Sequence, residues 1–148
     1  MVNRILHPKK FFTKEEKRRI VEAIRQAEGQ TSGEIRVFVE RRGHPEVLTR
    51  AKKVFQKLGM TRTQKRNGVL IYFSLSQRAF AIVGDEGIHA KVGDNFWKGI
   101  AAGMEKHFSQ DDFSLGLVEG IREMGATLRR YFPRGAGDTN ELSDEVAG

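Results

Sequence analysis

Residues 68–75 read GVLIYFSL, and every side chain from Val69 to Phe73 is aliphatic or aromatic. A strand with one face in water alternates polar and apolar residues, and this segment shows no such alternation. We therefore expect a β-strand that is buried on both faces, in a sheet with helices packed on its two sides. The expected fold class is α/β, as a three-layer α/β/α sandwich around a small mixed sheet.

Two further segments are expected to join this strand in the sheet. Residues 34–40, EIRVFVE, alternate in period two and are rich in β-branched and aromatic residues. Residues 79–83 return after the short turn at residues 76–78, so this strand and the central one should form an antiparallel hairpin. We expect the hairpin to end in a loop at residues 84–87, where two glycines permit a tight turn.

About four helices are expected to flank the sheet. The first is marked by a capping-box pattern at Thr13 and Glu16, followed by apolar residues at helical spacing until Gly29. The other three are expected from about Pro45 to Gly59, from Asp94 to about Phe108, and from Ser114 to about Tyr131.

The domain organisation follows from length and composition. A chain of 148 residues has the size of one domain, which we place at residues 13–133. Residues 1–12 are then an N-terminal extension. Residues 134–148 hold three glycines and four acidic residues but little to bury, so we expect a disordered tail.

Several functional classes are excluded or lose support. The chain has no cysteine, so it has no disulfide, thiol nucleophile or thiolate zinc site. It contains no GxxxxGK[ST] loop, GxGxxG fingerprint, GxSxG elbow or DxDxT motif. We expect no nucleotide or organic cofactor. Residues 1–12 carry no signal-peptide-like apolar run, and the uncharged residues 67–77 are too few to span a bilayer, so we expect a cytoplasmic protein without a transmembrane segment.

Positive charge is concentrated in the first half of the chain. Residues 1–66 hold 18 Lys and Arg against 7 Glu, whereas residues 67–148 hold 8 Lys and Arg against 12 Asp and Glu. A basic patch of this kind suits an anionic membrane, an RNA or an acidic partner, and a solvated surface is the alternative. Nucleic acid is the less expected partner, because interleaved aromatic residues and known nucleic-acid motifs are missing from the sequence.

The loop at residues 84–87 presents two adjacent carboxylates, Asp85 and Glu86, at the end of a strand. Clefts form where strands of α/β sheets end, so a ligand or metal site is one interpretation of this loop and a polar turn is the other. Asp94 lies close enough in sequence to join such a cleft, but Asp is also a preferred N-cap residue. Asn67 is likewise either a cleft residue or part of a plain turn before the strand, and His89 either lines the cleft or is a surface or capping histidine.

Three segments in order, TSGEIRV at residues 31–37, NGVLIY at residues 67–72 and IVGDEGI at residues 82–88, resemble the TPM domain family. This family contains thylakoid-lumen photosystem-repair proteins and many bacterial proteins of unassigned role. The similarity runs from about Phe11 to Pro133, and the sequence resembles in particular a bacterial subgroup without signal peptides.

The resemblance implies an α/β/α sandwich with a cleft between the Asn67-Gly68 turn and the loop at residues 84–87. It also implies a divalent cation, Ca²⁺ or Mg²⁺, because some relatives bind such ions there. The implied cleft residues are Arg66, Asn67, Gly68, Gly84, Gly87 and His89, and the implied metal ligands are Glu34, Asp85, Glu86 and Asp94. Many relatives carry Asp or Asn where this chain has Arg66 and Glu where it has His89, so two positions that can supply an anionic ligand in relatives do not supply one here.

We expect from these features a binding or assembly module for a protein partner, including one associated with a membrane, with a weak cation site in the cleft. The alternative is a metal-assisted phosphatase, since this activity has been attributed to plant members of the family. In that case Asp85, Glu86 and Asp94 would hold the cation, and Arg66 or His89 would contact the phosphate. A second alternative is binding of the basic N-terminal half to an anionic membrane or RNA. The sequence gives no oligomeric state.

Overall fold

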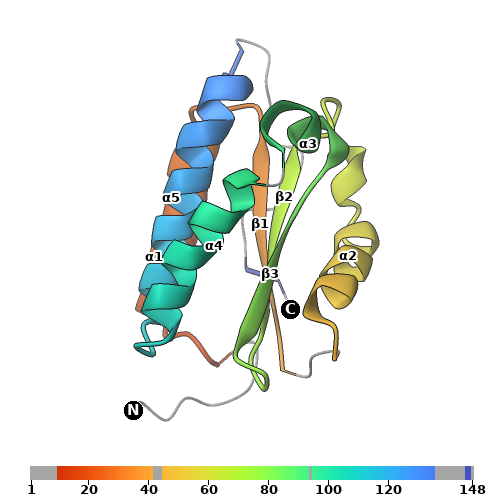
Figure 1. Ribbon diagram of the computed structural model, residues 1–148. Helices are drawn as coiled ribbons and strands as arrows, with labels where there is room; N and C mark the ends of the chain where they lie inside the picture. The colour runs from red at the N-terminus through yellow and green to blue at the C-terminus, as the bar shows by residue number, and fades with distance from the viewer. Residues whose placement is uncertain (1–9, 42–44, 94, 136–145, 148) are drawn as a thin grey trace.

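The computed structural model describes residues 10–41, 45–93, 95–135 and 146–147, and Figure 1 presents the arrangement of their helices and strands. The elements are α1 (Lys14–Glu28), β1 (Glu34–Glu40), α2 (Val47–Lys57), the 3₁₀ turn η1 (Met60–Arg62), β2 (Gly68–Ser74), β3 (Ala79–Gly84), α3 (Glu86–Val92), α4 (Asn95–Phe108) and α5 (Phe113–Tyr131). Among the described residues, no helix is both long enough and apolar enough to cross a lipid bilayer.

The sheet is small and mixed, as predicted. Its strand order is β1-β2-β3, with β1 parallel to β2 and β3 antiparallel to β2. Every residue of β2 is buried, which confirms the two-sided burial expected from its sequence. The register pairs Glu34 with Gly68 and Val69 with Gly84, so the start of β1, the start of β2 and the end of β3 meet at one end of the sheet.

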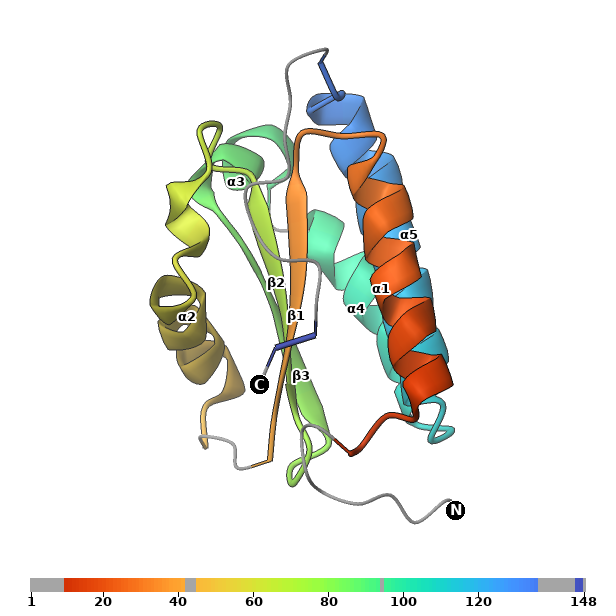
Figure 2. The same cartoon turned by 180° about the vertical axis from the view of Figure 1, so that it is seen from behind.

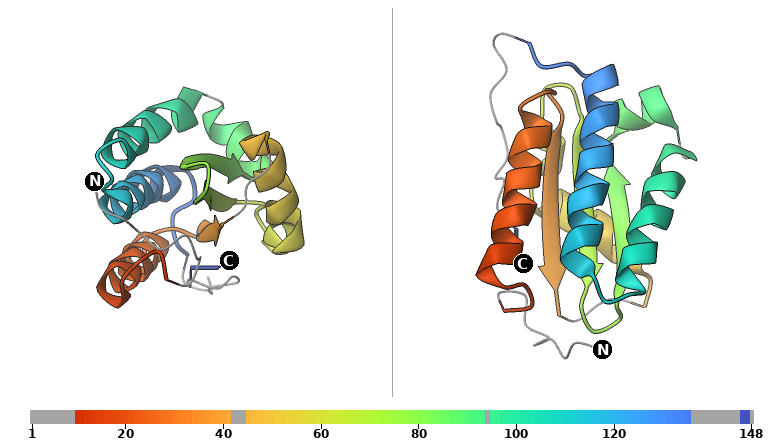
Figure 3. Two further views of the ribbon diagram at one scale, coloured as in Figure 1. Left: turned by 90° about the horizontal axis from the view of Figure 1, so that it is seen from below. Right: turned by 90° about the vertical axis from the view of Figure 1, so that its left-hand side faces the viewer.

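Helices cover both faces of the sheet, which confirms the α/β/α sandwich. Helices α1, α4 and α5 lie together on one face, and α2 lies alone on the other (Figures 2 and 3). The first layer encloses the larger core, in which Val37 and Ile71 of the sheet join a cluster with Ile24 and Ile121. The second core is smaller and groups Leu70 and Tyr72 of β2 with three buried side chains of α2, namely Ala51, Val54 and Phe55.

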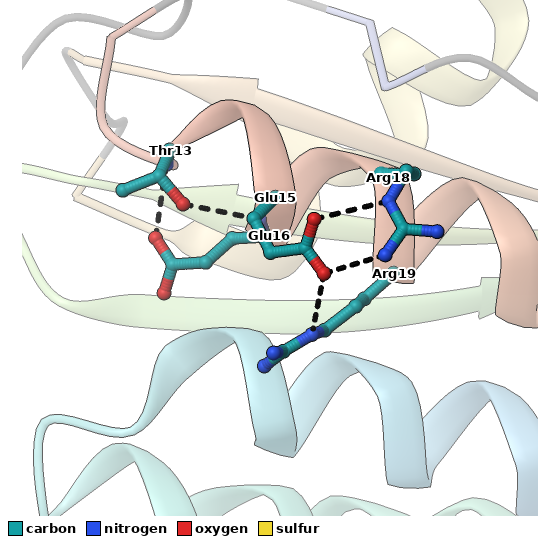
Figure 4. A network of polar contacts seen from close by, with 5 residues as sticks. All are labelled: Thr13, Glu15, Glu16, Arg18 and Arg19. Carbon is teal, nitrogen blue, oxygen red and sulfur yellow. Dashed lines mark hydrogen bonds and ion pairs between the residues drawn. The ribbon is translucent and has the colours of Figure 1, made fainter.

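The start of α1 is fixed by the predicted capping box. The Thr13 hydroxyl accepts a hydrogen bond from the Glu16 N–H at 3.1 Å, and the Glu16 carboxylate accepts one from the Thr13 N–H at 2.9 Å (Figure 4). Glu15 pairs on the exposed surface with Arg18 and Arg19. The cap satisfies two backbone donors that the first helical turn leaves open, and this explains why the helix begins where the sequence indicates.

Residues 84–87 do not form the expected loop. Asp85 is the N-cap of α3, its side chain accepts a hydrogen bond from the Glu86 N–H at 2.8 Å, and Glu86 and Gly87 lie in the first helical turn. This helix has seven residues, of which only Ile88 is buried. A helix of two turns with one buried residue produces no helical periodicity, so the sequence offered little sign of it.

The domain also extends beyond the predicted boundaries. Phe11 and Phe12, which we assigned to the N-terminal extension, are buried in the larger core. The prediction of a disordered tail does not hold at its end, because Ala147 lies beside β1: its N–H donates to Val37 O and its carbonyl accepts from Val39 N–H, both at 2.8 Å. Residues 136–145, the greater part of that tail, lie outside the described residues, as does Asp94, the expected cap of α4.

A polar group ties α2 to the sheet. Arg50 of α2 donates two hydrogen bonds to Glu40 at the end of β1, at 2.6 and 3.0 Å, and the Tyr72 hydroxyl donates to the same carboxylate. Glu40 and Arg50 are both half-buried. The Arg50 hydrogen bonds lower the pKa of Glu40 against the opposing effect of burial, whereas burial and the Glu40 hydrogen bond raise the pKa of Tyr72.

Replacing Glu40 by Gln should therefore lower stability at neutral pH by about 1–3 kcal/mol, the typical cost of leaving a charge-assisted bond unmade. Because folding lowers the pKa of Glu40, its contribution is present above the unfolded pKa of about 4.3 and is lost as the pH falls through the folded pKa. In urea unfolding, the difference in stability between wild type and Glu40→Gln should thus be larger at pH 7 than at pH 3.

Glu15→Gln is the matched control, because Glu15 also pairs with arginine but on the exposed surface. This variant should unfold at the wild-type urea concentration. A Glu40→Gln protein that is as stable as wild type at pH 7 would contradict the proposed role of the Glu40–Arg50 pair.

Candidate functional site

The two segments that were predicted to form a cleft do converge at one end of the sheet. The Asp85 N–H donates to Gly68 O at 2.9 Å, and the Gly87 N–H donates to Arg66 O at 3.0 Å. Glu34 lies at the same end, where its N–H donates to Asn67 O at 3.3 Å and its side chain is buried. We call Arg66, Asp85 and Glu86 the strand-end cluster, because their side chains interact at this end.

An arginine occupies the space between the two carboxylates of this cluster. Arg66 Nε and Nη2 donate to the two carboxylate oxygens of Asp85 at 2.7 and 2.9 Å, and Nη1 lies 3.1 Å from Glu86 Oε1. Asp85 is 5% exposed and Arg66 39% exposed. The hydrogen bond to Asp85 raises the pKa of Arg66. The sequence analysis treated Arg66 as a cleft residue that replaces an anionic ligand and could contact a phosphate; in the structure its guanidinium binds both carboxylate oxygens of Asp85, the main candidate ligand.

The remaining predicted residues point to other partners. Asn67 is buried; its N–H donates to Thr63 Oγ1 at 3.1 Å, and its side chain donates to Ser32 Oγ at 3.2 Å. The His89 ring is exposed on α3 and lies edge-on to Trp97, with ring centroids 6.5 Å apart. Asn67 therefore links the start of β2 to the segment before β1 by a hydrogen bond. His89 lies on the surface, where α3 approaches α4.

The described residues lend no support to a divalent-cation site. They contain no group of three or more His, Asp or Glu side chains placed to hold one, and Asp94, which completes the predicted ligand set, lies outside them. A cation at Asp85 would also have to displace the bidentate guanidinium of Arg66. The predicted Ca²⁺ or Mg²⁺ site therefore stays a prediction from the family resemblance.

The two predicted loop glycines are required by close packing. A Cβ at Gly87 would lie 2.2 Å from Lys65 O and 2.6 Å from Arg66 O. A Cβ at Gly84 would lie 2.5 Å from Trp97 Cζ2. These glycines let α3 and the indole of Trp97 rest directly on the backbone of neighbouring segments.

A second feature, which the sequence did not predict, is a groove along β3. It has a volume of about 740 Å³ and is lined by residues 78–82, by Leu48 of α2, and by Trp97, Ala101 and Phe108 of α4. Figure 1 shows β3 at the front of the sheet, with α4 on its left and α2 on its right. At one end of the groove, Arg78 pairs with Asp111 at 2.9 Å. We call this feature the β3 groove.

The floor of the β3 groove is the outer edge of the sheet. Within the part of the chain that the structure describes, β2 is the strand that pairs with β3, and no strand pairs with the other side of β3. The strand reads AFAIVG and contains no charged residue or proline. Leu48 on the neighbouring wall is 50% exposed. The sequence thus shows an apolar strand without charge, but only the fold shows that this strand lies at the edge of the sheet.

The chain matches a known protein family. The family model described as the TPM domain, whose name includes the word phosphatase, matches residues 5–127. The chain belongs to the TPM domain family. This confirms the resemblance seen in the three sequence segments. No functionally curated protein matches the chain.

Solved structures resemble this TPM domain over most of its length. The BA42 protein from the psychrophilic bacterium Bizionia argentinensis is 41% identical, with 97% of this chain and 99% of that chain covered and a TM-score of 0.89. The N-terminal domain of a P. gingivalis protein is 19% identical, covers 82% of this chain and 78% of its own, and has a TM-score of 0.67. The N-terminal domain of the Corynebacterium glutamicum cg2496 protein is 14% identical, with 89% and 82% covered and a TM-score of 0.64. The last two share the fold.

Gly87→Ala should destabilise the TPM domain by about 1–3 kcal/mol, because the added methyl group would overlap two backbone carbonyls that cannot move without shifting the β2 entry. Thermal unfolding measures the change. Gly99→Ala is the matched control: nothing lies within 4 Å of its Cβ position, and Ala is preferred in a helix interior by about 1 kcal/mol. The same substitution should thus lower the melting temperature at Gly87 and raise it at Gly99, and two changes of the same sign would contradict the packing argument.

Proposed function

We propose that this TPM domain is a binding module that docks a protein partner in the β3 groove. The observation that carries the proposal is the apolar outer edge of β3, which lies open between α2 and α4. Free strand edges in soluble proteins are normally protected by charge, proline, a bulge or a covering segment, because they otherwise pair with other chains. An unprotected strand edge is therefore better suited to pairing with another chain than to contact with water.

The size and chemistry of the groove support this function. Its volume of about 740 Å³ lies within the range of ligand-binding pockets, roughly 300–1,000 Å³. The walls combine Trp97, Phe108 and Leu48 with a few charged groups, the composition that gives affinity through apolar contact and orientation through polar contact. Trp97 Nε1 is buried and has no hydrogen-bond partner among the described residues, so the protein bears the cost of an unsatisfied buried donor beside this groove.

The metal-assisted phosphatase remains an alternative that rests on the family resemblance and on the name of the family model. The geometry adds no support, because both carboxylates of the strand-end cluster contact Arg66. The cytoplasmic location likewise stays a prediction from the sequence.

A groove-filling variant tests the proposed function. Ten-residue peptides are selected from a random display library on the immobilised full chain, and their affinities are measured by titration calorimetry. Ala101→Trp should weaken their binding at least tenfold, because Ala101 lines the groove and a large side chain would occupy it.

Ala102→Trp is the control, since Ala102 is the next residue of α4 and is exposed without lining the groove. It should leave binding unchanged, and circular dichroism should give both variants the wild-type helix content. If the library yields no binders, or if the two variants bind them equally well, the groove is not the binding site and the proposal fails.

Arg66→Gln tests the cation site separately. Losing the pair with the buried Asp85 should lower the melting temperature of the domain, but by less than the loss of a fully buried pair would, because Arg66 is partly exposed to solvent. If Asp85 and Glu86 can hold Ca²⁺ or Mg²⁺, 10 mM of either ion should raise the melting temperature of Arg66→Gln more than that of wild type. No shift in either protein would remove the cation from this cluster.

A further inference from the structure

The β3 groove constrains the shape of its occupant through the backbone of β3. The Asp85 N–H bonds to Gly68 O, and the β2–β3 register pairs Val83 with Leu70 and Ala81 with Tyr72. In an antiparallel pair, residues alternate between bonding the partner strand and facing away from it. Since Asp85 bonds β2, Val83 and Ala81 do so as well, and the N–H and C=O groups of Phe80 and Ile82 face outward into the groove.

These outward groups match an extended chain. Phe80 and Ile82 are two residues apart, so their backbone groups repeat at about 6.6 Å, which is the repeat of hydrogen-bonding groups along an added β-strand. A peptide in this position would satisfy them through its main chain, as in other cases of strand addition to a sheet edge. A compact small molecule cannot reproduce such a row of alternating donors and acceptors.

The two walls of the groove differ in chemistry. On the α4 side the groove is lined by the apolar residues Trp97, Ala101 and Phe108 and by the oppositely charged Lys98 and Glu105. On the α2 side it is lined by Leu48, and Lys52 follows one turn later on the same face of the helix and is exposed. Helix α2, residues 47–57, contains four Lys and Arg and no Asp or Glu. The α2 wall is thus purely basic in its charged residues, whereas the α4 wall combines apolar side chains with one cation, Lys98, and one anion, Glu105.

We propose, on the basis of the proposed function, that the partner contributes an extended segment that adds a strand to the outer edge of β3. Successive side chains of a strand point to opposite faces of the sheet. One set would face α2 and the other α4, so the segment alternates acidic residues, next to Lys52, with apolar residues, next to Ala101 and Trp97.

Charge argues against a second copy of this chain as the occupant. The β3 sequence AFAIVG has no acidic residue to place beside α2. Pairing two β3 edges about a two-fold axis perpendicular to the sheet would also bring the two basic α2 helices together on one face, where like charges repel. The matching segment therefore comes from a different, acidic partner.

The test uses the full chain and a synthetic probe, an acetylated and amidated octapeptide of alternating Glu and Val. Calorimetry should detect its binding, and a peptide with the same composition in two blocks, four Glu followed by four Val, should bind at least tenfold more weakly. In NMR hydrogen exchange, the Phe80 and Ile82 amides should become protected when the alternating peptide is present.

Backbone methylation separates strand addition from simple apolar contact. Two versions of the alternating peptide are made, with N-methyl groups on the odd or on the even residues. Only one set of peptide amides can face β3, so one version should lose binding and the other should keep it. Equal binding of both versions would overturn the strand-addition model.

Lys52→Glu tests the charge assignment, with Lys14→Glu on α1 as a control that changes the net charge equally. The first should weaken the Glu-Val peptide about three- to tenfold and strengthen a Lys-Val analogue, because a charge at the edge of a binding site is reversed, and the second should change neither. If library peptides bind in the groove but the alternating peptide does not, this inference fails and the proposed function stands. If neither binds, both fail, and a dimer in size-exclusion chromatography would then favour a second copy as the occupant.

Discussion

The burial of β2 on both faces is the constraint on which the rest of the structure depends. All seven residues of this strand are buried, so each face of the sheet must be covered by helix. Helices α1, α4 and α5 cover one face, and α2 covers the other over β2 and β3 (Figure 3). Helix α2 on one face and α4 on the other flank the edge strand β3, and the outer edge of β3 forms the floor of the gap between them. The β3 groove thus lies where the described sheet ends between its two helical layers.

The strands and long helices could be predicted because their signals are local. The unbroken apolar run of β2, the alternation of β1 and the capping box of α1 each lie within a few residues, and each matches the structure. Helix α3 could not be predicted in this way, because two turns with one buried residue carry no periodicity. Phe11, Phe12 and Ala147 were misassigned for a different reason: their contacts join residues far apart in the sequence.

The candidate site was also predictable only in part, because some of its features follow from strand order and others depend on contacts between distant residues. The convergence of Asn67, Gly68 and Asp85 followed from strand order, since strand ends that meet at one edge bring their loops together. The position of the Arg66 guanidinium between the two carboxylates could not be predicted from strand order. It depends on the local backbone at Arg66, where φ is 51°, and on how far the side chain extends from it. The β3 groove could not be predicted from the sequence. Its walls come from Leu48, residues 78–82 and Ala101, and no short stretch of sequence contains all three.

The two edges of the sheet give the strongest reason to look for the partner outside the described chain. Both edge strands are rich in apolar residues, and both therefore need protection from water and from other strands. At β1 this chain supplies it, because Ala147 pairs with Val37 and Val39. At β3 the described residues supply two helix walls and leave the backbone between them open. A protein that covers one edge with its own residues 146–147 and frames the other with a basic α2 wall and an α4 wall rich in apolar side chains has the arrangement expected if the second edge is used for recognition.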